Sequence, residues 1–379
     1  MSKVAVLKTS PKTVIGDYGR LMHLAEYEKF LPKGNKTIIK LNLSWTLYYP
    51  ACSSAPWQLE GLIKTIKDDG YEDVIAVENQ TVVTHPWKGA YSNKWLPILN
   101  RNKIKFQPLT NVKWIPFKPK SEILALNEIF YEKSNEFLIP NIFIGSNIIH
   151  LPTVKTHGHT TTTGAMKDAF GGLIPKYRHH AHKKIHEILV DLLTIQKEIH
   201  KGIFAVMDGC VCGDGAGPRT MEPFYGNIIL ASEDQVAVDA VSAKIMGFDP
   251  LKIDYIKMAH DKGLGVGDIH QIEIVGIDEN DFKKLNFGFK TKRSPIIKWD
   301  QRLRKKTANI KWLHRLLFHS PVFISFIFAS EFYHDWCWYP LIGQKRIKEF
   351  SKTEWGRLFE EYKYGKLPKY ERVFNWDPY

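Results

Sequence analysis

The sequence is poor in cysteine, and its few cysteines are spaced in a way that excludes several classes of protein. Cys52, Cys210, Cys212 and Cys337 fit neither a disulfide framework nor a pair of C-x-x-C metal motifs. The two thiols of "CVC" at 210–212 are close enough to share a metal, but two ligands do not make a site. The N-terminal "MSKVAVLKTSPK" has no apolar signal region, so we expect a cytoplasmic protein.

Long apolar runs and low-complexity tracts are also missing. The most apolar stretch, residues 316–330, is interrupted by His319, Ser320 and Pro321 and is too short to span a bilayer. It could lie on a membrane behind its basic flank, although we favour burial against the rest of the protein. The 379 residues, 44% hydrophobic and 25% charged, are otherwise typical of two domains or of one large α/β domain with an extension.

Positive charge is in surplus. The chain has 53 Lys and Arg against 40 Asp and Glu, which gives a formal net charge of +13. A surplus of this kind suggests an anionic partner, such as phosphate, nucleic acid, acidic lipid or a carboxylate substrate. It does not require one, because many basic enzymes bind no polyanion.

Up to about residue 285, short β-branched runs alternate with helical patterns. Strands are predicted at 4–7, 37–45, 73–79, 104–109, 143–152, 203–209, 227–232 and 272–276. Amphipathic helices are predicted at 56–70, 183–202 and 233–247. Strands separated by such helices need crossover connections, so the expected fold class is α/β, with a mostly parallel sheet flanked by helices. Ligands in such folds bind beyond the carboxyl ends of strands, where four polar residues would lie: Asn42, Glu78, His157 and Asp208.

After residue 285 the character of the chain changes. Residues 290–315 are basic, the next stretch is apolar and aromatic, and residues 353–365 indicate a final surface helix. We therefore divide the chain into an α/β core (1–285) and a helical, aromatic-rich C-terminal extension (286–379). The extension is expected to pack on the core or on a partner chain.

The most unusual stretch is "KTHGHTTTTGAMKDAFGGLIPK" at 155–176. Four consecutive threonines disfavour a helix, whereas "GAMKDAFGG" indicates a short helix that glycine closes. We interpret the stretch as a polar loop leading to a helix N-terminus, which is a common way to hold an anion. Lys167 lies in the first turns of that helix, where desolvation would make it a base or nucleophile, or where its charge would simply hold an anion.

Histidines gather in the same region. Six of the fifteen lie between 157 and 186, and His182 and His186 have the i, i+4 spacing that puts two side chains on one helix face. Neutral imidazole is a common ligand of zinc, nickel and iron. A solvated loop of histidines without function remains the alternative.

Two further segments contain candidate ligand-binding residues. "IKLNLSW" contributes Lys40 and Asn42 at the end of a predicted strand. "MDGCVCGDGAGP" at 207–218 contributes Asp208 and Gly215, and its glycines would let backbone N–H groups line an anion site. It has neither the Walker pattern nor a G-x-G-x-x-G leading into a helix, and a tight connecting turn is the alternative.

Five stretches in this order resemble the domain of unknown function 362 family. They are "K-x-N" at 40–42, "LPTVKTHGHTTTTGAMKDAFGGLIP", "DG…GDGAGP", "ILASEDQVAVDAVSAKIMGFDP" and "GLGVGDI…IEIVG", spanning about residues 36 to 277. The family usually starts its first motif with Lys-Pro-Asn, which here is Lys40-Leu41-Asn42. Some relatives carry a ferredoxin-like cysteine array. This chain has none, so an iron–sulfur cluster is not expected.

A more distant likeness is to the nickel-pincer lactate racemase family. That family has a histidine, a glycine-rich segment, a lysine joined covalently to the pincer cofactor, Leu/Ile-Pro and a metal-binding histidine. The matching order here is His157, Gly164, Lys167, Ile174-Pro175 and His182. The Ser-Gly-Gly-Arg before that lysine is replaced by Thr-Gly-Ala-Met. The likeness therefore implies a shared fold and pocket position more than a shared reaction.

From these features we expect an enzyme that acts on a small anionic or carboxylate-bearing substrate, with racemase- or isomerase-like acid/base chemistry assisted by a metal. His157, Lys167 and His182 are the expected catalytic residues. The expected substrate-binding residues are Lys40, Asn42, Thr160, Thr163, Gly164, Asp208 and Gly215. The expected metal ligands are His157, His159 and His182, for zinc, nickel or iron. If Asp208 and Asp214 dominate the cleft instead, their oxygens would suit magnesium or calcium. The alternative is a non-catalytic protein that docks on nucleic acid or acidic membrane through residues 290–315.

Overall fold

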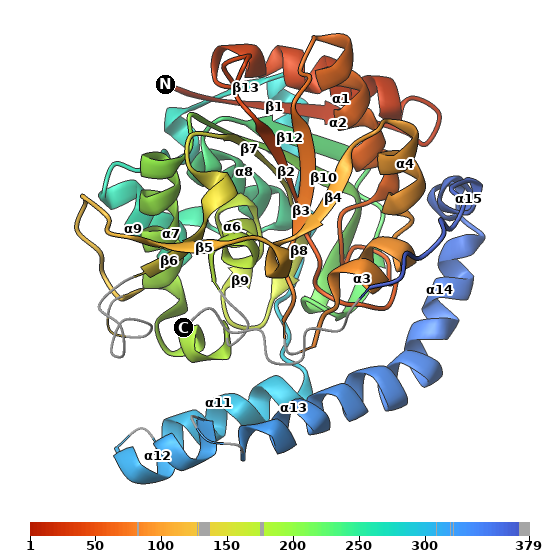
Figure 1. Ribbon diagram of the computed structural model, residues 1–379. Coiled ribbons are helices and arrows are strands. Elements are labelled where there is room, and N and C mark those ends of the chain that lie inside the picture. Colours follow the sequence, from red (N-terminus) through yellow and green to blue (C-terminus); the bar gives the residue numbers. More distant parts are fainter. Residues whose placement is uncertain are drawn as a thin grey trace.

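The computed structural model describes residues 1–81, 83–126, 128, 137–174, 178–307, 309–318, 320 and 322–370. Its centre is a large mixed sheet (Figure 1) with the strand order β13-β1-β12-β10-β7-β2-β3-β4. These strands are β1 (Ser2–Lys8), β2 (Thr37–Leu41), β3 (Val74–Glu78), β4 (Lys105–Pro108), β7 (Asn147–Leu151), β10 (Gly202–Ala216), β12 (Ile228–Ser232) and β13 (Ile272–Val275). Neighbouring strands run parallel except at β12, which is antiparallel to both β1 and β10.

Helices cover both faces of this sheet, as the sequence pattern predicts. On one face pack α6 (Ala165–Leu173), α7 (Ile185–Ile199), α8 (Gln235–Met246) and α9 (Asp254–Asp261). On the other face pack α1 (Val14–Leu24), α2 (Pro56–Asp68) and α4 (Trp95–Arg101). Successive residues of a strand point to opposite faces, so Val4 and Val6 join the first layer while Ala5 and Leu7 join the second.

The glycine-rich segment at 207–218 is the main departure from the predicted elements. It is not a connecting loop: β10 continues to Ala216 and forms a hairpin with β11 (Thr220–Phe224). The glycines permit close packing inside the sheet, because a Cβ on Gly213 would lie 2.4 Å from the sulfur of Met221. Smaller elements complete the core: β5 (Trp114–Phe117), β6 (Phe137–Pro140), β8 (Thr153–His157), β9 (Thr161–Thr162), α3 (Pro86–Ser92) and α10 (Glu279–Lys284).

The C-terminal extension is helical and lies along the core. It contains α11 (Pro295–Thr307), α12 (Lys311–Phe318), α13 (Phe323–Glu331), a π-helical stretch (Phe332–Gly343), α14 (Gln344–Ser351) and α15 (Glu354–Glu361). In Figure 1, α11 and α13 run side by side below the sheet, and α14 leads up to α15 near α4. None of the helices in the described ranges has both the length and the apolarity needed to cross a membrane.

Aromatic side chains and hydrogen bonds attach this extension to the core. The indole of Trp45 donates to Asp335 over 2.7 Å, and the rings of Trp57 and Trp355 lie 5.1 Å apart. The ammonium of Lys94, a buried residue, donates to the carbonyl of Phe359 over 2.9 Å. The extension is therefore part of the folded unit and can contribute walls to a site on the core.

Candidate functional site

A cavity of about 320 Å³ lies where the carboxyl ends of β2, β3 and β8 meet the extension. The core supplies polar side chains from these strand ends and from α6, among them Lys40, Asn42, His157 and Lys167. The extension covers them with α11 and α13. The position agrees with the general rule for α/β sheets, in which ligands bind beyond the carboxyl ends of the strands.

Lys40 forms the buried floor of this cavity. Its ammonium lies 3.0 Å from the carboxylate of Glu78 and 3.6 Å from that of Asp168, and all three side chains are almost fully buried. The Gly171–Gly172 pair makes room for it, because a Cβ on Gly171 would lie 2.8 Å from the Lys40 nitrogen. The glycine pair of the unusual 155–176 stretch therefore lets α6 pass directly over a buried lysine.

Asp168 is held on its other side by a buried histidine. Nδ1 of His150 lies 3.1 Å from Oδ2 of Asp168, and Nε2 of the same ring lies 2.6 Å from the side-chain oxygen of Gln196. This arrangement leaves the other carboxylate oxygen of Asp168 facing Lys40. The chain His150–Asp168–Lys40 thus fixes the position of the cavity floor.

Positive charge exceeds negative charge around the cavity. Five Lys or Arg side chains line it (Lys40, Lys167, Arg178, Arg219 and Arg304) against three carboxylates (Glu78, Asp168 and Asp300). Glu78 and Asp168 pair with Lys40, and Asp300 pairs with Arg304 over 2.9 Å. The remaining three cations form no close ion pair among the described residues, although Glu78 and Asp168 act on Arg178, and Asp335 acts on Arg219, at longer range. The cavity lining therefore carries net positive charge.

Lys167 is the cation whose proton is held most weakly. Burial in the cavity lowers its pKa to about 7, and the neighbouring charges of Lys155 and Arg178 act in the same direction. The ammonium of Lys155 is itself buried, with its pKa lowered to about 8 by burial. Near neutral pH a substantial fraction of Lys167 is therefore the free amine, which can accept a proton.

The imidazole of His157 is neutral, and a backbone hydrogen bond determines which of its two nitrogens carries the proton. Burial, together with the nearby charge of Lys167, lowers its pKa well below the usual range. The backbone N–H of His159 donates to Nδ1 of His157 over 3.2 Å, and a backbone amide can only donate. The proton of the neutral ring is therefore on Nε2, so His157 acts in the cavity as a hydrogen-bond donor.

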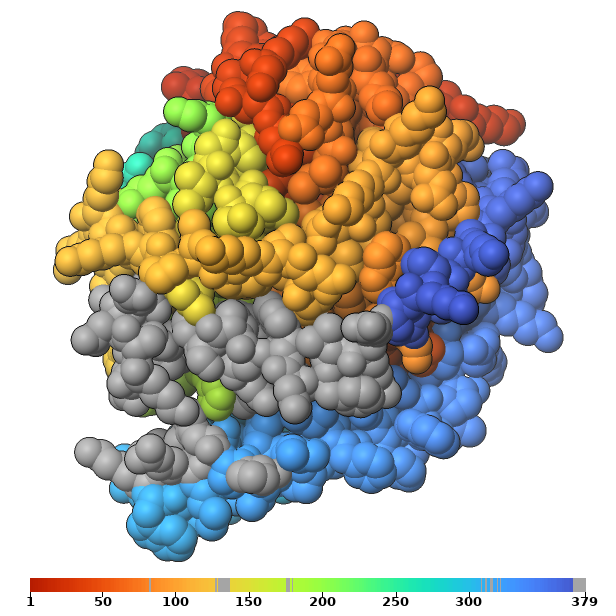
Figure 2. Space-filling model, viewed as in Figure 1, coloured from red at the N-terminus to blue at the C-terminus, as the bar shows by residue number. Residues whose placement is uncertain are grey.

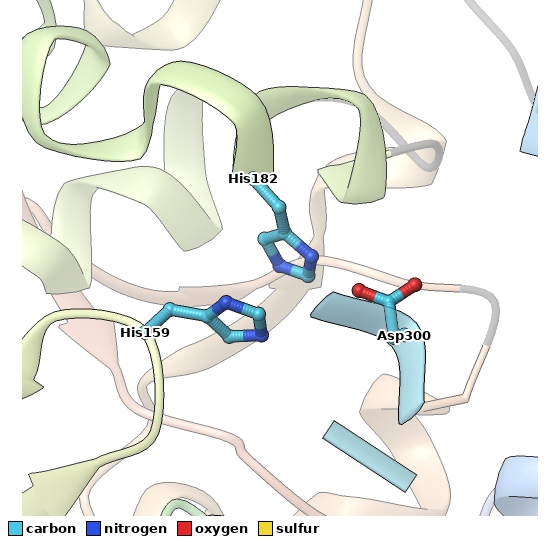
Figure 3. A group of neighbouring side chains, drawn as sticks. All are labelled: His159, His182 and Asp300. Carbon is cyan, nitrogen blue, oxygen red and sulfur yellow. The ribbon is translucent and has the colours of Figure 1, made fainter. Parts of the chain in front are cut away.

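His159, His182 and Asp300 form a group that could hold a metal ion. One ligand atom from each lies within 4.8 Å of the others, and the two imidazole rings stack with centroids 4.3 Å apart (Figure 3). Burial lowers the pKa of His159 to about 4, so its ring is neutral, the form that binds metals. The side-chain NH2 of Gln301 donates to Nδ1 of His159 over 3.1 Å and so fixes the orientation of this ring. His157 is not a member of the group, and Asp300 of α11 takes its place.

His186 is separated from His182 despite the i, i+4 spacing. The helix predicted from residue 183 begins only at Ile185, so His182 lies in the preceding 3₁₀ turn (Arg178–Lys184). Nδ1 of His186 accepts a hydrogen bond from the backbone of Tyr255, whereas His182 lines the cavity. The spacing therefore does not bring these two residues together.

The predicted threonine and glycine ligands of the 155–176 stretch lie outside the cavity walls. The hydroxyl of Thr160 donates to the carbonyl of Thr162, and that of Thr163 to the carbonyls of Thr153 and Lys155. The threonines thus satisfy the backbone of a tight hairpin between β8 and β9.

The N-terminus of α6 is also occupied by protein. Asp239 accepts hydrogen bonds from the backbone of Ala165 and Met166 and would contact any Cβ added at Gly164, 2.2 Å away. These backbone N–H groups are therefore not free to hold an external anion, contrary to the expectation from sequence.

Asp208 and Gly215 also lie away from the cavity. Asp208 accepts hydrogen bonds from the hydroxyl of Tyr18 (2.7 Å) and the indole of Trp57 (2.9 Å), on the face of the sheet covered by α1 and α2. Gly215 pairs with Met221 in the β10–β11 hairpin. Cys210 and Cys212 are buried, and burial raises the pKa of both thiols, so neither is a thiolate ligand at neutral pH.

Sequence reasoning missed several residues of the cavity, namely Asp168, Arg178, Arg219, Asp300 and Arg304. Asp168 follows Lys167 directly and lies in the first turn of a helix, and this position could have identified it as a cavity residue from the sequence. Asp300 is the single acidic residue in the basic stretch 290–315, which also gave a signal. Nothing local distinguishes Arg178 or Arg219 from other basic residues of the chain.

Comparisons with known proteins give a family and one informative relative. A family model described as "Domain of unknown function (DUF362)" matches residues 37–244, more than half of the chain. A thylakoid-associated protein of Synechocystis sp. is 29% identical over 122 residues. That match covers 31% of this chain and 37% of the relative's length. No solved structure matches the chain.

Proposed function

Since this chain belongs to the DUF362 family, whose description assigns no activity, we propose its function from the cavity: it is an enzyme that acts on a small anionic or carboxylate-bearing substrate. The observation that carries the proposal is the set of three cavity cations without a close carboxylate partner among the described residues, Lys167, Arg178 and Arg219. Burying cations without counter-ions is costly, and a bound anion removes that cost.

The protonation states favour acid/base chemistry. Lys167 has a pKa of about 7, so it can exchange a proton with the substrate near neutral pH, as an acid/base group with a pKa near the working pH does best. The Nε2–H of His157 and the guanidinium of Arg178 stabilise the negative charge that develops on a substrate oxygen. Proton transfer at the carbon next to a carboxylate is the reaction class this arrangement suits, as in racemases and isomerases.

The extension gives the cavity an apolar wall opposite its cationic floor. Ile297 of α11 and Phe326 and Ile327 of α13 line this side. An anion with an apolar portion would use both surfaces, because the apolar part leaves water while the charge meets the cations. The substrate class we propose is therefore an anion that carries an apolar group.

The proposal is tested by thermal shift with acetate, lactate, inorganic phosphate and octanoate. We expect an anion-dependent rise in melting temperature, larger for octanoate than for acetate, because binding only to the folded state raises stability. The rise should be lost in Lys167→Met and retained in Lys201→Met, which removes an exposed lysine far from the cavity. An equal rise in melting temperature in both variants would show that the anions bind outside the cavity.

We also propose that a divalent ion binds to His159, His182 and Asp300. Two imidazoles and a carboxylate suit zinc, nickel or iron, and the ion would polarise a substrate oxygen as a Lewis acid. Zinc–ligand bonds of about 2.1 Å would need the three side chains to close inward slightly from their present spacing. In this role His182 is a ligand, and Lys167 with His157 provides the acid/base groups.

Elemental analysis of untagged protein, purified without chelator, tests the ion. We expect near-stoichiometric metal in the wild type and a loss of most of it in His182→Ala and Asp300→Asn. His270→Ala, at an exposed histidine outside the cavity, is the matched control and should keep its metal. Equally low metal in all four proteins would reject the site and leave a metal-free anion cavity.

The four cysteines are free, and three of them are buried, which supports the proposal that the protein works in a reducing compartment such as the cytoplasm.

The alternative function, non-catalytic docking on nucleic acid or acidic membrane, is favoured by the exposed lysines of α11. The name of the Synechocystis relative associates that protein with thylakoids, which supports a membrane rather than a nucleic acid as the surface. Attachment to a surface and catalysis in the cavity are compatible.

A further inference from the structure

The extension exposes a row of large apolar side chains on its outer side. Ile324, Phe328, Phe332 and Trp336 are 66%, 66%, 51% and 77% exposed. They recur at every fourth position through α13 and the π-helical stretch, so they lie on one face of a continuous helix. The rings of Phe328 and Phe332 stack with centroids 6.3 Å apart.

This row is distinct from the side chains that hold the extension to the core. Phe326 and Ile327 of the same helix line the cavity, and Trp338 packs against Trp45 and Tyr49. Further exposed apolar residues of the extension lie outside the row: Trp299, Trp312, Leu316, Leu341 and Ile342. A concentration of exposed large apolar side chains in one part of a folded chain marks an interaction site.

A dense positive charge lies beside the apolar row. Residues 290–315 contain ten Lys or Arg and one Asp. This stretch therefore supplies most of the formal net charge of +13 that the whole chain carries. Lys298, Arg302, Lys305 and Lys306 of α11 are all exposed. α11 and α13 run side by side (Figure 1), and the rings of Trp299 and Phe326 lie 5.1 Å apart.

We propose that the described residues of 295–343, here called the amphipathic arm, bind flat on a membrane surface that contains anionic lipids. The exposed row enters the boundary between headgroups and acyl chains, Trp336 lies at the headgroup level, and the lysines and arginines of α11 contact lipid phosphates. Figure 2 shows the extension forming a band along one edge of the molecule, where a flat surface can approach it.

Charge and apolarity together favour a membrane over the other occupants. A nucleic acid would match the basic residues but would leave the exposed phenylalanine and tryptophan side chains without apolar contact. A second copy of the chain would cover the apolar row but would bring two strongly basic helices together. An anionic bilayer satisfies both features.

Flotation of the full-length protein with lipid vesicles tests the proposal. The protein should float with vesicles of phosphatidylcholine mixed with phosphatidylglycerol, and weakly with phosphatidylcholine alone. Phe328→Ser with Trp336→Ser should lower the partition coefficient roughly tenfold or more, because two aromatic side chains no longer leave water. Lys305→Glu with Lys306→Glu should abolish the preference for phosphatidylglycerol.

Ile144→Ser is the matched control, because Ile144 is an apolar core residue that is 50% exposed and lies outside the arm. It should float like the wild type. All of these changes are at exposed positions, and circular dichroism confirms that each variant is folded. Unchanged flotation of the Phe328/Trp336 variant would overturn the proposal. Two other results would also overturn it. In the first, the wild type does not float with vesicles and forms a dimer that Phe328→Ser with Trp336→Ser dissociates. In the second, the wild type does not float and binds an oligonucleotide as well as this variant does. None of these outcomes depends on whether the cavity binds small anions.

Discussion

Replacing Lys40 by methionine is expected to lower the free energy of unfolding by about 3–5 kcal/mol, since removing one partner of a buried ion pair leaves the other buried and uncompensated. Glu78, 3.0 Å away and 2% exposed, would lose its counter-ion, and Asp168 would lose its nearest cation. Burial already raises the pKa of Glu78, and the loss of the Lys40 charge should raise it further.

Urea unfolding of Lys40→Met and two companion variants measures this cost. Lys36→Met is the matched control, because Lys36 pairs with Asp73 at the surface and such pairs contribute about 0–1 kcal/mol. Glu78→Gln added to Lys40→Met should recover part of the loss by removing the uncompensated carboxylate. Similar losses in Lys36→Met and Lys40→Met would mean that the buried pair is not structurally important.

Lys167 is expected to react as a free amine at a pH far below that of an ordinary lysine. Competitive labelling with acetic anhydride over a pH series, read by mass spectrometry, should give a midpoint near its pKa of about 7. An ordinary lysine side chain has a pKa of about 10.4. A midpoint for Lys167 close to that ordinary value would contradict its role as an acid/base group at neutral pH.

The same shift makes stability depend on pH in a defined direction. The pKa of Lys167 is lower in the folded than in the unfolded chain, so the cost of burying its charge is fully present below about pH 7. As the pH rises above 7, the folded chain releases this proton while the unfolded chain still holds it, and stability increases. Lys167→Met should remove this increase.

Much of the fold follows from local sequence patterns. All eight predicted strands are present, and the predicted helices correspond to α2, α7 and α8, because apolar periodicity reports which face of an element is buried. The segment 207–218 was misinterpreted because glycines in a turn and glycines in a closely packed strand look alike in one sequence. Its pairing with β11 and β12 depends on residues distant in the chain.

The candidate site was predicted in part. Lys40, Asn42, His157, His159, Lys167 and His182 all line the cavity, and most of them follow the end of a strand or begin a helix. The threonines were assigned to a ligand because sequence does not show that backbone carbonyls accept their hydroxyls. Asp300 was missed because it reaches the cavity only when the extension folds back over the core.

The central claim is that a cavity lined by more cations than carboxylates binds an anion while Lys167 changes its protonation state. Titration calorimetry with octanoate at pH 8 tests this claim most directly. The titration is done in two buffers that differ in ionisation enthalpy. The difference between the binding heats in the two buffers gives the number of protons that the protein takes up on binding. A bound anion raises the pKa of Lys167, so the wild type should take up close to one proton and Lys167→Met almost none. Binding without proton uptake, or with equal uptake in both proteins, would contradict the claim.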